Sequence, residues 1–218
     1  MNVKYIFFDL DGTLTDPGEG ITNSVAYALK KYGIEVSQKK SLYKFIGPPL
    51  INSFMEHYGF TKEQAATAID YFREYFSTKG IFENRLYDGI TPLLKDLKAK
   101  NLQIVLATSK PEKFAVQILK HFEIYSYFDF IAGATMSENR TDKAEVIAYA
   151  LKELNLTDTS SILMVGDREY DISGAHFHNI KAIGVEYGYG SLEELTASDA
   201  DFTAKTVKDL HNLLINEL

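Results

Sequence analysis

Two acidic residues, Asp9 and Asp11, stand one residue apart where the apolar run YIFFDL (residues 5–10) ends. A carboxylate at the end of a buried strand is costly to desolvate unless a positive group meets it. Two interpretations are open. Asp-Gly is a common turn sequence, so the pair could be a solvated turn; otherwise it was placed to hold a cation and do chemistry.

Polar residues also end two later apolar runs. Thr108, Ser109 and Lys110 close the run that begins at Gln103, and Asp167 closes the run SILMVGD, with Asp171 shortly after it. Ligands of open parallel sheets bind outside the carboxyl ends of the strands. If these runs are parallel neighbours, their polar side chains are expected to share one crevice.

A lysine, Lys143, begins a helical pattern and is expected to join this crevice. Clustered carboxylates need a hard divalent cation, and all-oxygen ligation favours Mg²⁺ over zinc. A carboxylate can attack phosphorus, while a hydroxyl and an ammonium hold the equatorial oxygens. Gly12 permits a turn whose backbone N–H groups point at an anion. The set therefore suits phosphoryl transfer.

The elements that must position these residues follow from the apolar patterns. Short runs rich in Val, Ile and aromatic residues predict buried strands at residues 5–10, 103–109, 128–134, 161–167 and 181–187. Helical patterns occupy residues 111–122 and 141–154. From about residue 88 onward the two types alternate, which predicts an α/β fold with a parallel sheet covered on both faces.

The segment from residue 17 to about 84 breaks this alternation. Apolar stripes predict helices in residues 21–33 and 61–80, each ending at a glycine, and FIGPPL (45–50) is a turn that starts another helix. We therefore expect a helical insertion after the first strand. The predicted domains are an α/β core of residues 1–15 and 85–218, and a helical cap of residues 16–84.

Composition excludes several classes of protein. The chain has 218 residues, 45% of them hydrophobic, and a formal net charge of −7, which argues against binding a nucleic-acid polymer. Without cysteine there can be no disulfide, thiol nucleophile or thiolate metal site. Neither a signal peptide nor a run of about 18 apolar residues is present, so we expect a cytoplasmic protein with no membrane partner. A monomer or a small homo-oligomer is expected.

The ordered motifs resemble the haloacid dehalogenase superfamily of phosphatases over essentially the whole chain. That family's pattern is Asp-x-Asp-Gly-Thr, a Thr or Ser after the second strand, a Lys, and Gly-Asp-x-x-x-Asp. DLDGT, TSK, the lysine of RTDK and GDREYD occur here in that order. The resemblance implies a Rossmann-like three-layer core with a parallel sheet, and an all-helical cap inserted directly after the first motif.

The resemblance also implies catalytic roles. Asp9 would be the nucleophile, and Asp11 the acid that protonates the leaving alkoxide and then activates water. Thr108, Ser109 and Lys143 would bind the transferring phosphoryl group. Because dehalogenases of the superfamily lack the second acid, Asp11 favours phosphate chemistry.

A Mg²⁺ site is implied by the same resemblance. Its ligands would be the carboxylates of Asp9 and Asp167 and the main-chain carbonyl of Asp11, with Asp171 supporting from nearby. In the cap, Gly47 and Pro48 are possible substrate contacts.

Structural roles are the alternative for several of these residues. Thr108 and Ser109 could be no more than the N-cap of the next helix, and Ser109 is expected both to cap it and to act in the site. Lys143 could be a surface lysine, although cations are mildly unfavourable at a helix start. Asp167 and Asp171 could be solvated acids that stabilise a helix N-terminus. Lys110 is a further possible substrate contact, but its expected role is peripheral electrostatics.

Two other features have simpler interpretations. Arg168, like Lys110, is expected to act as a peripheral charge, with contact to substrate as the alternative, and YGYG (187–190) is predicted to be a loop after the last main strand.

Within the superfamily, FIGPPL, TSKPEKFA, VGDREYD and GVEYGYGSLEEL look like the phosphoglycolate-phosphatase-like and 5'-nucleotidase-like branch. We expect a Mg²⁺-dependent phosphatase that hydrolyses a small phosphorylated metabolite through an aspartyl-phosphate. Two alternatives stay open: a phosphomutase similar to beta-phosphoglucomutase, and a non-catalytic regulator that binds a phospho-ligand in the same crevice.

Overall fold

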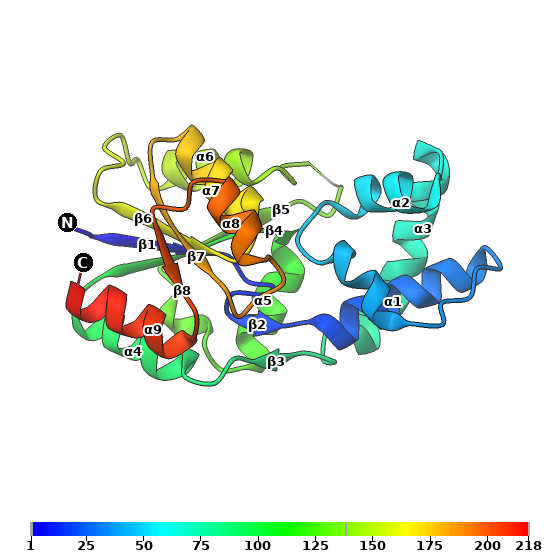
Figure 1. The fold of residues 1–218 in the computed structure, drawn as a ribbon, viewed down its shortest axis with the longest axis horizontal. Helices are drawn as coiled ribbons and strands as arrows, with labels where there is room; N and C mark the ends of the chain where they lie inside the picture. Colours follow the sequence, from blue (N-terminus) through cyan, green and yellow to red (C-terminus); the bar gives the residue numbers. More distant parts are fainter. Residues whose placement is uncertain (1, 138, 218) are drawn as a thin grey trace. The chain divides into compact units, whose positions relative to one another are not determined.

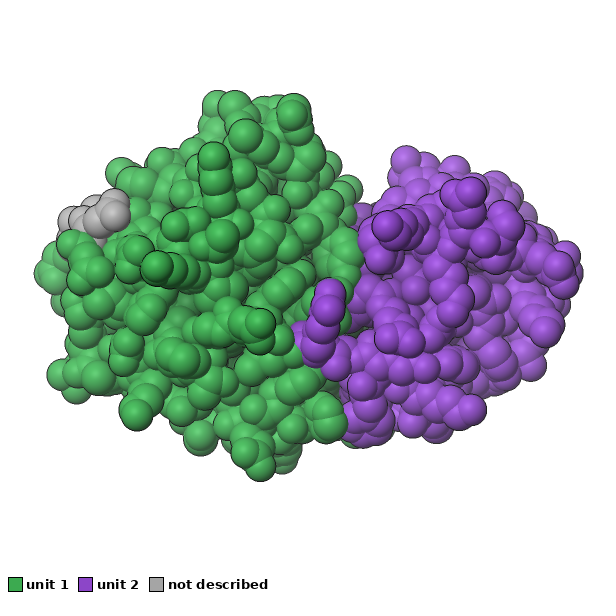
Figure 2. Space-filling model, turned by 60° about the horizontal axis from the view of Figure 1, so that its bottom comes forward, with its two compact units in different colours: residues 1–16, 86–218 green, residues 17–85 purple. Residues whose placement is uncertain are grey.

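The structure, a computed structural model, describes residues 2–137 and 139–217. The chain divides into two compact units, coloured separately in Figure 2. Unit 1 comprises Met1–Asp16 and Leu86–Leu218, and unit 2 comprises Pro17–Arg85. Each boundary lies one residue beyond the predicted one. Unit 2 is an insertion in the chain of unit 1, because unit 1 has one segment before it and one after it.

Unit 1 is built on a parallel sheet. Within the described residues it has six strands in the order β5-β4-β1-β6-β7-β8 (Figure 1). Every adjoining pair is parallel. The strands are β1 (Tyr5–Phe8), β4 (Gln103–Pro111), β5 (Phe130–Ala134), β6 (Ile162–Gly166), β7 (Lys181–Val185) and β8 (Phe202–Ala204). The predicted α/β fold with a parallel sheet is confirmed.

Helices cover both faces of this sheet (Figure 1). One face carries α6 (Lys143–Glu153), α7 (Glu169–Phe177) and α8 (Leu192–Ala197). The other carries α4 (Ile90–Ala99), α5 (Glu112–His121) and α9 (Val207–Asn212), and the short turns η3 (Tyr125–Tyr127) and η4 (Leu213–Glu217) complete the unit. The result is the expected three-layer arrangement.

The apolar runs form strands because both faces bury their side chains. Successive side chains of a strand point to opposite faces. Phe7 of β1 belongs to the apolar cluster that contains Ile147 of α6 and Ile172 of α7. Its neighbours Ile6 and Phe8 therefore point toward the opposite face, and all three side chains are buried. A strand buried on both sides needs a continuous apolar sequence, which explains the run YIFF.

Three details of the sheet differ from expectation. β8 was not predicted, because three residues at a sheet edge are too short to show a periodic pattern. β4 continues to Pro111, with a shift in its register against β5 between Thr108 and Pro111. Finally, β2 (Thr15–Asp16) and β3 (Arg85–Leu86) form a separate two-stranded sheet, so the two chain connections lie side by side.

Unit 2 is helical. Its elements are α1 (Gly18–Lys31), η1 (Lys39–Phe45), α2 (Leu50–Tyr58), α3 (Lys62–Tyr75) and the π-helical turn η2 (Phe76–Gly80). α3 begins with a capping box between Thr61 and Gln64. Pro49 is the N-cap residue of α2, immediately before the helix. Within the described ranges, no helix of either unit combines the length and the apolar character needed to cross a bilayer.

Candidate active site

The carboxyl ends of β4, β1 and β6 meet because β1 pairs with both other strands. Asp9 directly follows β1, and its N–H donates to the Val165 carbonyl of β6 at 2.9 Å. Asp167 directly follows β6, and Thr108 lies near the end of β4. All three side chains are buried. The topology therefore brings together the polar strand ends that the sequence singled out.

Three carboxylates form a compact cluster at this edge. One oxygen each of Asp9, Asp167 and Asp171 lies within 4.8 Å of the others. The ammonium of Lys143 donates to Asp9 Oδ1 at 2.6 Å and to the Ala107 carbonyl at 2.8 Å, and lies 2.7 Å from Asp171 Oδ1. Lys143 is only 5% exposed, so the interpretation as a surface lysine is wrong.

The cluster holds more negative charge than Lys143 can neutralise. Burial, followed by repulsion from Asp171 and Asp9, raises the pKa of Asp167 well above its ordinary value. Burial raises the pKa of Asp171 to about 6, against the lowering effect of Lys143. Burial would lower the pKa of Lys143, but the two carboxylates it contacts outweigh burial and raise it. Three clustered acidic side chains that all offer oxygen, with one ammonium paired to two of them, fit a hard divalent cation.

Neighbouring hydrogen-bond donors, two of them backbone N–H groups, orient two of these carboxylates. Tyr189 N–H donates to Asp167 Oδ2 at 2.7 Å, and the Thr13 hydroxyl donates to Asp167 Oδ1 at 3.5 Å. Arg168 N–H donates to Asp171 Oδ2 at 3.1 Å, at the start of α7. Asp171 therefore stabilises a helix N-terminus and also faces Lys143, so its two interpretations are compatible.

Gly12 allows the loop after β1 to lie against the cluster. Its φ is +87°, in the left-handed region that favours glycine, and a Cβ there would collide with the Asp167 carboxylate. This position therefore requires glycine both for backbone conformation and for space.

Asp11 lies beside the three-carboxylate cluster but is not part of it. Its Oδ2 is paired with the ammonium of Lys110, and its Oδ1 is buried without a hydrogen-bond partner in the described part of the chain. Burial raises the pKa of Asp11, although Lys110 opposes the shift. The Lys110 side chain is 7% exposed, so the expected peripheral role is wrong.

The remaining predicted residues differ in whether they lie at the site. Thr108 is buried and its hydroxyl accepts from Lys110 N–H at 3.3 Å. Ser109 does not cap α5, because β4 runs on and Pro111 is the N-cap residue. Arg168 pairs with Glu194 of α8 at 2.7 Å. Two further predictions, Gly47 and Pro48, lie in unit 2, and their contact with substrate stays a prediction.

Two tyrosines of the predicted YGYG loop contribute contacts that the sequence analysis missed. Tyr189 holds Asp167 through its backbone, and the Tyr187 hydroxyl donates to the Thr13 carbonyl at 3.0 Å. The segment is a loop, as predicted. The sequence signal that could have identified these tyrosines was their alternation with glycine shortly after β7, the strand that pairs with β6, after which Asp167 lies.

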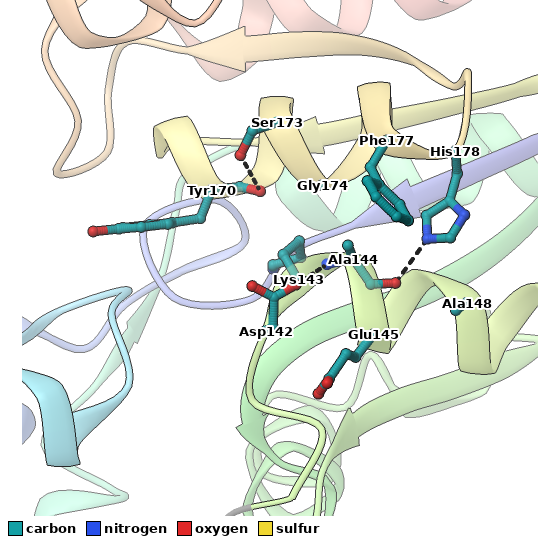
Figure 3. A pocket seen from close by; sticks show the side chains of 10 residues that line it. All are labelled: Asp142, Lys143, Ala144, Glu145, Ala148, Tyr170, Ser173, Gly174, Phe177 and His178. Carbon is teal, nitrogen blue, oxygen red and sulfur yellow. Dashed lines mark hydrogen bonds between the residues drawn. The ribbon is translucent and has the colours of Figure 1, made fainter.

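An open groove of about 620 Å³ lies beside the start of α6 and along α7 (Figure 3). His178 contacts the Ala144 carbonyl at 2.8 Å across it, and Phe177 is 75% exposed at its edge. Lys143 contributes to its lining, whereas none of the three clustered carboxylates does. The groove is therefore a neighbouring surface and not the carboxylate site itself.

The family model of the haloacid dehalogenase-like hydrolases matches residues 6–185. The chain belongs to this family. The predicted superfamily and the predicted hydrolase class are thereby confirmed, and all three clustered carboxylates lie within the residues that the family model matches.

Three proteins to which this chain is similar illustrate the range of its relatives. A 5'-nucleotidase of Pseudomonas aeruginosa is 45% identical over 192 residues, which are 88% of this chain and 86% of that protein. The tyrosine-protein kinase PtkA of Mycobacterium tuberculosis is 39% identical over 217 residues, 99% of this chain and 71% of that protein. The crystal structure of a predicted phosphatase from Clostridium acetobutylicum has a TM-score of 0.96 at 49% identity and covers 99% of both chains.

Proposed function

We propose that this protein is a Mg²⁺-dependent phosphatase that hydrolyses small phosphate monoesters through an aspartyl-phosphate on Asp9. The observation that carries the proposal is the buried Asp9 carboxylate, held at 2.6 Å by Lys143 and flanked by a second acid, Asp11. A binding protein has no need of both acids. The relatives named 5'-nucleotidase and phosphatase support a phosphate ester of a small metabolite as substrate.

The first half of the reaction forms a bond from an Asp9 carboxylate oxygen to phosphorus. The bond from phosphorus to the ester oxygen breaks, and Asp11 gives its proton to the leaving alkoxide. Burial raises the pKa of Asp11, which favours the protonated form that this step needs. The Thr108 hydroxyl and the Lys143 ammonium hold the equatorial phosphoryl oxygens, where negative charge is spread in the transition state.

The second half returns the enzyme to its starting state. Asp11, now a carboxylate, takes a proton from water as the water oxygen attacks phosphorus. The bond from phosphorus to Asp9 breaks, and inorganic phosphate leaves. Asp11 ends protonated and Asp9 ionised, so protons and bonds balance over the cycle.

The proposed Mg²⁺ ligands are the Asp9 and Asp167 carboxylates and the Asp11 main-chain carbonyl, with Asp171 adjacent. The excess negative charge around Lys143 and the all-oxygen donor set support this assignment. When bound, Mg²⁺ offsets the combined negative charge of these carboxylates and of the phosphate group.

The test is phosphate release from p-nitrophenyl phosphate, nucleoside 5'-monophosphates and phosphoglycolate, each with Mg²⁺ or with EDTA. We expect Mg²⁺-dependent release, and a loss of about 10³-fold or more in Asp9→Asn because the nucleophile is gone. Asp70→Asn, the same change at an exposed acid of unit 2, serves as the matched control. Full activity in Asp9→Asn would contradict the mechanism.

Transfer to an acceptor other than water is the second candidate function. The relative named tyrosine-protein kinase supports it, and a phosphomutase would use the same first step. With a sugar phosphate, free phosphate is measured against isomer; with ATP, phosphate is measured against phosphorylated tyrosine peptide. Phosphoryl groups recovered on an acceptor instead of as free phosphate would assign a transferase. Bound phospho-ligand with neither release nor Mg²⁺ dependence would assign a regulator.

The cytoplasmic location, the absence of nucleic-acid and membrane partners, and the monomeric or small homo-oligomeric state remain predictions.

A further inference from the structure

The loop Tyr187–Gly190, which follows β7, contacts two parts of unit 1 that have different roles. The backbone N–H of Tyr189 donates to Asp167 Oδ2 at 2.7 Å. The phenol of the same residue is hydrogen-bonded to the Asp16 carboxylate. One residue thus bridges a carboxylate of the cluster and the end of β2.

The loop is packed closely enough to transmit a displacement. A Cβ at Gly188 would collide with the Asp167 side chain and with the Gly12 carbonyl, so the loop lies directly against both. The Tyr187 hydroxyl donates to the Thr13 carbonyl at 3.0 Å, and its ring meets that of Tyr87 edge-on at 5.0 Å. Because interiors packed this tightly transmit strain, a shift at one end of the loop is felt at the other.

Asp16 occupies a particular place in the chain. It is the last residue of β2 and of the first segment of unit 1, and at Pro17 the chain enters unit 2. A hydrogen bond to Asp16 therefore acts on the connection between the two units, through a residue that also orients Asp167.

We propose that Tyr189 is a positioning residue that couples cation binding at Asp167 to the position of Asp16, where the chain passes into unit 2. The inference rests on the proposed function only in that Asp167 is a ligand of a divalent cation. Groups that orient a metal ligand from behind alter metal affinity when they are removed. Coupling is reciprocal, so a change at Asp16 alters cation affinity by way of Tyr189.

The test is a double-mutant cycle on the full chain, read out as Mg²⁺ affinity by isothermal titration calorimetry after EDTA treatment. Tyr189→Phe keeps the ring and the N–H on Asp167 but removes the phenol. We expect this variant and Asp16→Ala each to bind Mg²⁺ about fivefold or more weakly, and the double variant to lose no more than either one. Tyr125→Phe, at a 43% exposed tyrosine, is the matched control and should bind like wild type.

Three further readouts separate positioning from general damage. In Tyr189→Phe, the Mg²⁺ concentration for half-maximal p-nitrophenyl phosphate hydrolysis should rise by the same factor as the Mg²⁺ dissociation constant. Its kcat at saturating Mg²⁺ should change less than twofold. Its unfolding midpoint in EDTA should match that of Tyr125→Phe. Affinity unchanged within twofold, additive effects in the double variant, or no Mg²⁺ binding by wild type would each overturn the inference. A non-additive calorimetric cycle without any hydrolysis would support the inference and reject only the proposed function.

Discussion

At the scale of single residues, the organising feature is an imbalance of buried charge. One ammonium, that of Lys143, contacts the carboxylates of Asp9 and Asp171, and the carboxylate of Asp167 lies in the same cluster. Isolated buried charges are far more costly than paired ones, so each of these side chains depends on the others. The same excess of negative charge that favours a bound cation makes the stability of the metal-free protein depend on pH and on substitutions that remove a charge.

Lys143→Met should strongly destabilise the metal-free protein. Removing the ammonium leaves the buried carboxylates of Asp9 and Asp171 without this cationic partner, for which a loss of about 3–5 kcal/mol in the free energy of unfolding is expected. Urea unfolding in EDTA at pH 7.5 measures it. The control is Lys152→Met, at an exposed lysine of the same helix. Equal losses in the two variants would show that the charge cluster does not depend on Lys143.

Asp167→Asn should have the opposite effect on the metal-free protein. The pKa of Asp167 is raised well above 3.8 in the folded state, and that of Asp171 from 3.8 to about 6. A folded state with a raised carboxyl pKa binds the proton more tightly than the unfolded chain does. The contribution to stability is therefore full below about pH 4 and is lost as pH rises through the folded pKa.

Thermal unfolding midpoints in EDTA from pH 4 to 8 test this sign. Wild type should lose stability as the pH rises from about 4 past 6, whereas Asp167→Asn should lose less and be the more stable of the two at pH 7.5. Adding Mg²⁺ should raise the midpoint of wild type and leave that of Asp167→Asn nearly unchanged. A steeper pH dependence in the variant would refute the assigned direction.

At the scale of elements, the site depends on how closely α7 approaches α6. Gly174 of α7 packs against the stem of Lys143, the first residue of α6. The absence of a side chain at Gly174 leaves room for the stem of Lys143, whose ammonium contacts Asp9 and Asp171. Helix packing, and not only the motif, therefore sets the position of the ammonium.

Gly174→Ala should reduce activity through Lys143. The new Cβ would lie 2.8 Å from Lys143 Cγ and 2.9 Å from its Cβ, closer than packed atoms allow. Overpacking costs about 1–3 kcal/mol, and the better helix propensity of alanine returns about 1 kcal/mol, so we expect a net loss of at most about 2 kcal/mol in the free energy of unfolding. The kcat should fall about tenfold as the ammonium is displaced. Ser173→Ala, the adjacent exposed position, is the control, and equal kcat values would argue against a role for this contact.

At the scale of the whole molecule, strand order assembles the site from distant segments. Lys143 and Asp9 are 134 residues apart in the chain but 2.6 Å apart in space. The central position of β1 between β4 and β6 makes this possible. The helical insertion is compatible with this sheet because it enters and leaves through adjacent strands, β2 and β3.

Hydrogen exchange should report this assembly as a joint response. Comparing EDTA with Mg²⁺, we expect slower exchange in several segments at once, because all of them pack around the proposed cation. These segments are residues 9–13, 167–171 and 187–190. The helices α2 and α3 of unit 2 should exchange alike in both conditions. Slowing limited to one segment would contradict a shared site.

Much of the fold and of the site could be read from local pattern. The strand containing Phe7 was predictable because a strand buried on both faces leaves a continuous apolar run, which needs no partner to be recognised. Asp9, Asp11 and Asp167 stood out because acids directly after such runs are costly without a compensating cation. Lys143 was expected to join them because it begins the helix that follows a strand, and the family resemblance gave it a role, although a surface lysine was the alternative interpretation.

Only the tertiary structure decided which of these residues touch. It showed that Lys143 is buried, that Lys110 pairs with Asp11, and that Tyr189 bridges Asp167 and Asp16. It also showed that Pro111 and not Ser109 is the N-cap residue of α5, and that β8 extends the sheet. The physical reason is the range of the interactions. Burial patterns and turns arise between neighbours in the chain, whereas ion pairs and hydrogen bonds of the site join residues that only the strand order brings within reach.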